Sequence, residues 1–194
     1  MNETSHLTAE ELAAGWPHLR SAPREVGGLQ MIVRRPRIGE REVLAEAELD
    51  LERGLMGDNW LKRGSRSMPD GAANPEMQLN VMSARVVNLL ARERERWPIA
   101  GDQLYVDLDL SVENLPPGTR LAIGSAIIEV TAVPHTGCAK FARRFGPSAV
   151  QFVNSPEGKR LRLRGLNAKV VQAGAIREGD NVRRLRAEPS QSGE

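Results

Sequence analysis

The amino-acid sequence predicts a β-rich protein of the α+β class, folded as a closed β-barrel-like sheet with a few short helices. Two observations favour this class. Short runs of alternating apolar and polar residues follow one another at intervals of about 10 residues, with turns between them. Only a few segments have the apolar spacing of a helix. A chain of 194 residues is long enough for one domain with a sizeable core.

Composition excludes several classes of protein. The chain is 40% hydrophobic but has no apolar run near the roughly 18 to 20 residues that span a bilayer, so we expect no membrane contact. Its start lacks a basic region followed by an apolar core, so we expect no secretory signal. One cysteine cannot form an internal disulfide, and with three histidines it is a poor ligand set for structural zinc. These features predict a cytoplasmic protein.

Residues 1–26 are predicted to be an N-terminal extension with a short helix. Thr8 followed by Glu11 fits a capping box, in which each side chain satisfies a free backbone N–H at the helix start. We expect residues 27–186 to form the main domain. The polar residues 187–194 are predicted to be a disordered tail.

Strands are expected in the region before residue 60. Residues 28–36 alternate cleanly, and residues 41–50 also alternate although their composition favours helix, so we interpret both as strands. Gly54 and Gly57 predict turns with positive φ. Residues 62–76 are the least hydrophobic stretch in the middle of the chain and predict a long surface loop.

The second half begins with the clearest helix. A strand over residues 77–83 leads into it, with Ser83 as N-cap and Trp97-Pro98 as its end. Residues 102–110 then alternate cleanly and predict a strand. Two further strands are expected around Gly124, residues 160–164 alternate leucine with arginine, and the last strands fall within residues 167–185.

The only cysteine lies where a strand is followed by a helix. In the stretch "VPHTGCAKFARRFG", residues 133–146, Cys138 precedes a segment with helical spacing. Unpaired backbone N–H groups at a helix start favour an anion, and Lys140, Arg143 and Arg144 add positive charge. Such surroundings lower the pKa of a thiol, which suits a nucleophile or a metal ligand. A buried, inert cysteine is the alternative interpretation.

Other side chains near this cysteine are candidate site residues. His135 could orient or deprotonate the thiol, and Gly137, which has no Cβ, would let a ligand approach the backbone. Arg164 is a candidate contact for an anion. Asn167 is a candidate for positioning a ligand amide or for capping a turn. Asp58, with the two glycines before it, predicts a loop at the mouth of the site, or a backbone turn that it caps.

The charge distribution is uneven. Residues 134–177 contain nine Lys or Arg and one acidic residue, which gives +8, while the rest of the chain carries −6. Such a segment offers an anion a local field, and the alternatives are a solvated basic face or an RNA-binding module. Single-strand binders interleave aromatic with basic residues, whereas Phe141, Phe145 and Phe152 are spaced like the core face of two helices. We therefore expect no nucleic acid as partner.

Several elements together resemble a known family, the MOSC domain, which is also found at the carboxy end of molybdenum cofactor sulfurases. They are the stretch around Cys138, the strand pair before it and "GAIREGDNV" at residues 174–182, which matches a closing G-x-[IV]-x-x-G-D-x-V hairpin. "GLMGD" at residues 54–58 matches a Gly-rich element of the family. The resemblance extends from about Gly27 to Leu185. Where many members have Arg-x-Asn, this chain has "GDQL" at residues 101–104.

The resemblance implies a barrel-like fold and an essential cysteine. In one branch the thiolate ligates molybdenum and small N-hydroxylated compounds are reduced, which predicts a molybdenum cofactor (molybdopterin) and Cys138 as its metal ligand. The basic segment would then face the phosphate of the pterin. The electron donor would be a separate partner, because a single cysteine cannot hold an iron–sulfur cluster that needs several thiolate ligands.

The resemblance also leaves a second function open. In sulfurase-linked members the cysteine carries sulfur as a persulfide, so Cys138 could pass sulfur to a cofactor or to a partner protein. We expect no pyridoxal phosphate site in this chain, and a separate PLP-dependent cysteine desulfurase would supply the sulfur. The sequence thus predicts a molybdenum-cofactor oxidoreductase or a sulfur transferase.

Overall fold

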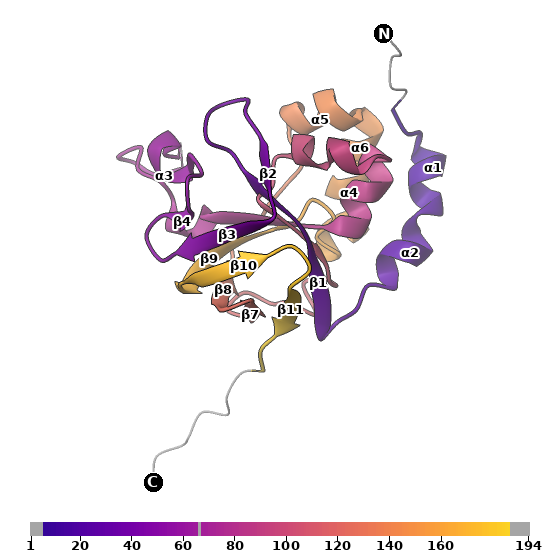
Figure 1. The fold of residues 1–194 in the computed structure, drawn as a ribbon. Helices are drawn as coiled ribbons and strands as arrows, with labels where there is room; N and C mark the ends of the chain where they lie inside the picture. The colour runs from indigo at the N-terminus through magenta and orange to yellow at the C-terminus, as the bar shows by residue number, and fades with distance from the viewer. Residues whose placement is uncertain (1–5, 66, 187–194) are drawn as a thin grey trace.

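The central element of the computed structural model, which describes residues 6–65 and 67–186, is a closed β-barrel (Figure 1). An eight-stranded sheet of order β11-β7-β8-β9-β5-β6-β1-β2 closes because β11 also pairs with β1, which leaves β2 outside the barrel. β5 and β6 are parallel, and the other neighbours are antiparallel. The predicted fold class is confirmed. The barrel strands are β1 (Val26–Arg34), β5 (Leu79–Ser83), β6 (Leu104–Asp107), β7 (Arg120–Ile123), β8 (Ala126–Val130), β9 (Leu166–Gln172) and β11 (Asn181–Arg184).

A small second sheet lies beside the barrel. It has the order β10-β3-β4, and β2 (Glu42–Leu44) links it to β1. The prediction that residues 174–182 form a hairpin is wrong. Its two strands do not pair with each other, because β10 pairs with β3 whereas β11 pairs with β1 and β7. β10 therefore forms an edge of the small sheet, whereas β11 lies between β7 and β1 and closes the barrel. The strands of the small sheet are β3 (Glu46–Asp50), β4 (Gly54–Leu55) and β10 (Gly174–Arg177).

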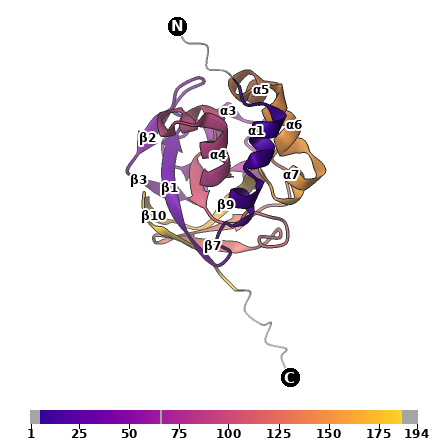
Figure 2. The ribbon, with the colours of Figure 1, turned by 90° about the vertical axis from the view of Figure 1, so that its right-hand side faces the viewer.

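Most helices gather on one side of the barrel, as Figures 1 and 2 show. α1 packs on α6, and α4 contacts β5 and β6. No helix in the described part of the chain is long and apolar enough to cross a membrane. The helices are α1 (Ala9–Ala14), α2 (Trp16–Arg20), α3 (Trp60–Arg63), α4 (Ala84–Ala91), α5 (Ala139–Phe145), α6 (Pro147–Asn154) and α7 (Pro156–Arg160), with 3-10 turns η1 (Pro75–Met77) and η2 (Arg94–Ala100).

Two hydrophobic cores result from this arrangement. One fills the barrel, and the other lies between the barrel wall and the helices. β6 serves both, because Leu104 and Val106 point into the barrel while the fully buried Tyr105 faces the helices and donates its hydroxyl to the Trp97 carbonyl at 2.8 Å. Phe141 of α5 joins the second core, as its helical spacing predicted. A strand buried on both faces binds the helical layer to the barrel.

The predicted helix from Ser83 to Pro98 is interrupted. α4 ends at Ala91, Arg92 has a φ of +64°, and η2 continues to Ala100 with Pro98 inside it. Pro98 has no backbone N–H and cannot continue an α-helical ladder, so the chain takes a tighter turn. Ser83 is the N-cap by position, but its side chain makes no capping hydrogen bond.

Three predicted strands end early or are absent. The strand over 102–110 stops at Asp107, because the Asp109 carboxylate accepts from the Ser111 N–H and forms a turn. The strand expected to lead directly to Cys138 is β8, which ends at Val130, and residues 131–137 connect it irregularly to α5. Residues 160–164 form no strand, since α7 ends there in a turn with Arg162 at a φ of +48°.

The remaining predictions concern the two ends of the chain and the long surface loop expected at residues 62–76. The capping box of α1 is confirmed, with Thr8 N–H to Glu11 at 2.8 Å and Glu11 N–H to Thr8 at 3.2 Å. The predicted loop begins within α3, is tied by the Ser65 N–H to Ala72 carbonyl bond at 2.9 Å, and ends in η1. The predicted tail, residues 187–194, lies outside the described residues.

Gly165→Ala tests the tight packing at the start of β9. Gly165 has a φ of +105°, and a Cβ there would lie 2.2 Å from the Val81 carbonyl oxygen, whereas Gly179 has a φ of +92° with open space around it. We expect a loss in free energy of unfolding of about 2 to 4 kcal/mol at Gly165 and of about 1 kcal/mol at Gly179. Denaturant unfolding measures both, and equal losses would contradict the steric argument.

Candidate functional site

Cys138 lies at the N-cap of α5 and is exposed, so the alternative of a buried cysteine is wrong. Its carbonyl accepts the first helical hydrogen bond, from the Ala142 N–H at 3.0 Å. The residue before it is clamped, because the Asn154 side chain bonds both the N–H and the carbonyl of Gly137 at 2.9 Å. A Cβ on Gly137 would lie 2.9 Å from a methyl of Val153, so the absence of a side chain lets this glycine pack closely on α6.

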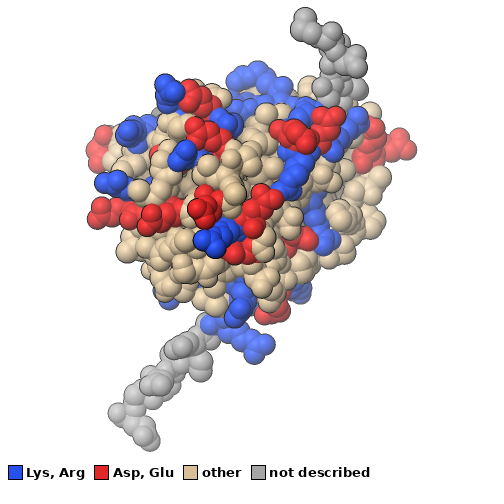
Figure 3. Space-filling model, viewed as in Figure 1, with Lys and Arg blue, Asp and Glu red and all other residues tan. Residues whose placement is uncertain are grey.

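A cavity of about 490 Å³ opens beside this cysteine, and we call it the Cys138 pocket. Eight basic residues and no acidic residue line it. Figure 3 shows Lys and Arg side chains over α5 at the top of the molecule. The pocket therefore carries an excess of positive charge, which favours an anion. Its basic residues are Arg35, Arg37, Arg41, Arg63, Lys140, Arg143, Arg144 and Arg164.

Half of these cations come from a region that sequence analysis did not connect with the cysteine. Arg35, Arg37 and Arg41 belong to the connection from β1 to β2, and Arg63 ends α3. The signal was present in "RRPRIGER" at residues 34–41, where four arginines fall within eight positions. Only the fold shows that this run faces α5.

Two of the cations are fixed by buried carboxylates. Arg35 forms a two-pronged pair with Asp58, with Nε–Oδ2 and Nη2–Oδ1 distances of 2.9 Å. Nη1 of Arg164 lies 2.8 Å from both carboxylate oxygens of Asp102. Both guanidinium groups also bond backbone carbonyls of residues 100–101, at 3.0 Å and 3.2 Å. These bonds hold the two arginines rigidly in the pocket wall.

The other cations are less well neutralised. The Nε of Arg41 is buried without a hydrogen-bond partner among the described residues. Burial lowers the pKa of Arg41, and the nearby Arg144 and Arg35 lower it further. Burial and the charge of Arg35 likewise lower the pKa of Arg63. Crowded, partly desolvated cations favour an added anion. Within the described residues, the cations of the pocket without a carboxylate within 4.0 Å are Arg41, Arg63, Lys140, Arg143 and Arg144.

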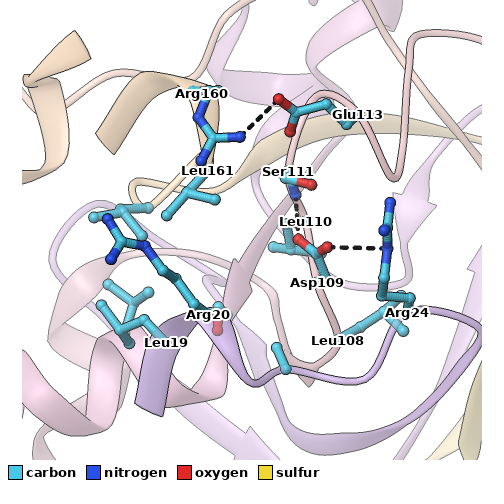
Figure 4. A pocket seen from close by; sticks show the side chains of 14 residues that line it. Leu19, Arg20, Arg24, Leu108, Asp109, Leu110, Ser111, Glu113, Arg160 and Leu161 are labelled. Atoms are coloured by element: carbon cyan, nitrogen blue, oxygen red, sulfur yellow. Dashed lines mark hydrogen bonds and ion pairs between the residues drawn. The ribbon is translucent and has the colours of Figure 1, made fainter. Parts of the chain in front are cut away.

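A cavity of about 430 Å³ near α2 and α7 provides the contrast (Figure 4). Arginines line it too, but carboxylates neutralise them. Arg160 lies 2.7 Å from Glu113 and Arg24 lies 3.6 Å from Asp109, while Arg20 pairs with a carboxylate of α7. This cavity is charge-balanced, so an excess of positive charge distinguishes the Cys138 pocket.

The local field acts on the thiol. Partial burial opposes ionisation of Cys138, but the backbone N–H groups of Phe141 and Lys140 and the charges of Arg164 and Arg144 outweigh it. The pKa of the thiol is therefore lowered from its ordinary value. This geometry favours a thiolate that faces the basic pocket.

His135 is not placed as expected. Its Nε2 lies 2.9 Å from Asp102, and it lines a different cavity from the cysteine. Burial and the charge of Arg164 lower the pKa of His135, although Asp102 opposes this. Burial also opposes ionisation of Asp102, but Arg164 and His135 hold the pKa of its carboxyl far below the usual range. His135 thus belongs to a buried Arg–Asp–His cluster, with no hydrogen bond to Cys138 among the described residues.

Two further candidates lie behind the pocket. The side chain of Asp58 is fully buried, accepts from the Trp60 N–H, and holds Arg35. Asn167 is also fully buried and donates to the Val133 carbonyl at 3.0 Å, which supports the loop that leads to the cysteine. Neither lines the pocket. Gly54 and Gly57 have the expected positive φ, at +67° and +80°.

Comparison with known proteins agrees with this fold. YuaD from Bacillus subtilis superposes with a TM-score of 0.63 at 14% identity, over 84% of this chain and 97% of that one. YiiM from Escherichia coli has a TM-score of 0.54 at 20% identity, over 83% of this chain and 71% of that one. At these identities the likeness shows the fold alone. No curated protein matches the chain.

The fold and the cysteine site define a barrel protein with a basic pocket beside an exposed thiol. The sequence model of the MOSC domain matches residues 69–183, more than half of the chain. The chain therefore belongs to the MOSC domain family, as its sequence motifs predicted.

Arg144→Gln should raise the pH at which Cys138 becomes reactive. Removing this cation weakens the field that favours the thiolate. The pH profile of alkylation by iodoacetamide gives the midpoint. We expect the wild-type midpoint below the ordinary thiol value of about 8.5 and the variant midpoint above that of the wild type. Arg20→Gln, in the charge-balanced cavity, is the control, and an equal shift in both variants would refute a local effect.

Asp102→Asn should destabilise the protein in a pH-dependent way. The change leaves Arg164 buried and unpaired, so we expect a loss of about 3 to 5 kcal/mol at pH 7. Because folding lowers the pKa of this carboxyl, its contribution is complete above about pH 4 and fades as the pH falls below that value. Denaturant unfolding at several pH values should show the two proteins converging in acid. Glu113→Gln, at an exposed pair, should change little at any pH.

Proposed function

We propose that the Cys138 pocket binds a molybdenum cofactor through the Cys138 thiolate, and that the protein reduces small N-hydroxylated compounds. The observation that carries this proposal is an exposed thiol of lowered pKa beside a pocket in which five cations lack a carboxylate partner among the described residues. Membership of the MOSC domain family supports the molybdenum cofactor at the level of the family.

The residues of the pocket fit such a group. The pterin carries a phosphate, and guanidinium groups bind phosphate in a planar, two-pronged manner. The Nε of Arg41, buried without a partner among the described residues, is a donor available for it. A thiolate is a soft ligand that suits molybdenum. A cavity of about 490 Å³ falls within the range of small-molecule sites.

Each part of the pocket then has a defined task. Arg41, Arg63 and Arg144 bind the phosphate, and the N–H groups of Lys140 and Phe141 keep the Cys138 sulfur ionised. When bound, the cofactor supplies two-electron redox chemistry at the metal. Reduction of an N–O bond in a hydroxylamine consumes two electrons and two protons and gives an amine and water. A separate donor protein delivers the electrons.

The exposure of Cys138 favours one alternative function. An accessible, ionised cysteine can hold a persulfide: its thiolate attacks the outer sulfur of a persulfide on a donor protein, the S–S bond of the donor breaks, and the donor cysteine leaves as a thiolate. A PLP-dependent cysteine desulfurase would be that donor, and a metal–sulfur cofactor or a partner protein would accept the sulfur. In this function the basic pocket binds the anionic acceptor.

The molybdenum content of the wild type and of Cys138→Ser distinguishes these functions. Both are expressed in a host that makes the cofactor, and the metal is measured by mass spectrometry. We expect metal in the wild type, loss of metal in Cys138→Ser, and reduced metal in Arg41→Gln/Arg144→Gln because the phosphate loses two contacts. Arg20→Gln should retain the wild-type content.

The contrary outcomes are equally specific. Retention of metal by Cys138→Ser would exclude the cysteine as ligand. If neither protein contains metal, intact-mass analysis for one added sulfur atom on Cys138 decides whether the protein is a sulfur carrier.

A further inference from the structure

A second cavity, of about 420 Å³, lies on the other side of Arg164, and we call it the His135 cavity. The loop 131–136 and the segment 158–166 form most of its wall. Arg164 is the one residue that it shares with the Cys138 pocket. The two cavities are therefore separate spaces with one lining residue in common.

The wall of the His135 cavity is largely apolar. Val133, Val153 and Leu166 line it, and Val112, which is 43% exposed, lies among its lining residues. An exposed valine beside an apolar cavity offers hydrophobic surface to a ligand. The body of a fitting ligand is thus a small branched or aromatic hydrocarbon group.

Three cations line the cavity, Lys159, Arg162 and Arg164, and Arg162 donates from Nη1 to the Leu115 carbonyl at 2.5 Å. Arg164 has a side chain that is 9% exposed, and its buried Nε has no partner in the described part of the chain. Lys159 is exposed at the end of α7 and has no carboxylate within 4.0 Å among the described residues. His135 uses Nε2 for Asp102 and still has 15% of its side chain exposed. No acidic side chain of the described residues lines the cavity.

We propose that the His135 cavity is a second ligand site, which binds a small organic carboxylate with an apolar body. The carboxylate lies between Lys159 and Arg164, and the hydrocarbon part lies on Val133, Val153 and Leu166. A free phosphate lacks the apolar part, and a neutral hydrocarbon leaves the Arg164 N–H without an acceptor. The site does not depend on the metal and goes beyond the function proposed for Cys138.

Titration of the full-length protein with 4-methylpentanoate, followed by amide NMR, tests this site. We expect shifts in residues 131–136 and 158–166 and none in residues 37–41, which belong to the Cys138 pocket. The neutral analogue 4-methylpentanamide should bind at least about fivefold more weakly, because it offers no charge to the cations of the cavity. Inorganic phosphate should cause no shifts in this cavity.

Two exposed lysines provide matched variants. Lys159→Gln should weaken binding of 4-methylpentanoate by up to about fivefold, while Lys140→Gln, the same change in the Cys138 pocket, should leave it unchanged. Val112→Asp places a like charge among the lining residues and should weaken binding further. Shifts confined to the Cys138 pocket, equal binding of the amide, or equal effects of the two lysine variants would each overturn the proposal. Because Lys159→Gln should retain molybdenum content, failure here is distinct from failure of the cofactor proposal.

Discussion

The buried pair of Arg164 and Asp102 is the interaction on which the site depends. A guanidinium with a 9% exposed side chain is stable only beside a counter-charge, and Asp102 supplies it with both oxygens at 2.8 Å. Arg164 also lies 4.8 Å above the ring of Phe141, which ties the start of α5 to the barrel. The same residue contributes to the field at Cys138 and lines both cavities. Arg164 thus contributes to the packing of α5, to the ionisation of the Cys138 thiol and to the walls of both cavities.

Strand pairing explains why cations from distant segments face one another. β1 pairs with β6 so that Ile32 lies opposite Leu104, and the chain after β1 then brings Arg35 to the carbonyl of Gly101. η2 ends at Ala100, whose carbonyl accepts from Arg164. The turn before β6 is therefore the common anchor of both arginines. Its two carbonyls and the buried carboxylates Asp58 and Asp102 offset part of the repulsion among the guanidinium groups.

The three cavities differ in how far carboxylates neutralise the arginines that line them. Arginine lines the Cys138 pocket, the His135 cavity and the charge-balanced cavity alike, so the residue type does not identify an anion site. The pairing of each arginine distinguishes the cavities. Arg160 and Glu113 neutralise each other, whereas Arg41 keeps a buried donor without a partner among the described residues. A closed barrel supplies the rigid support for this excess charge, because its backbone groups are already paired. The cysteine adds the thiolate that can bind a metal or carry sulfur.

The sequence by itself determined the barrel class, the family and the place of Cys138 at a helix start, because strand alternation and the motif around Cys138 are local patterns. It also determined the capping box and the core face of α5. Tertiary structure alone decided that residues 34–41 and Arg63 join the pocket, that β10 and β11 separate into different sheets, and that His135 turns to Asp102. These outcomes depend on contacts between residues far apart in the chain, and no local periodicity encodes which strands pair or which buried charges find each other.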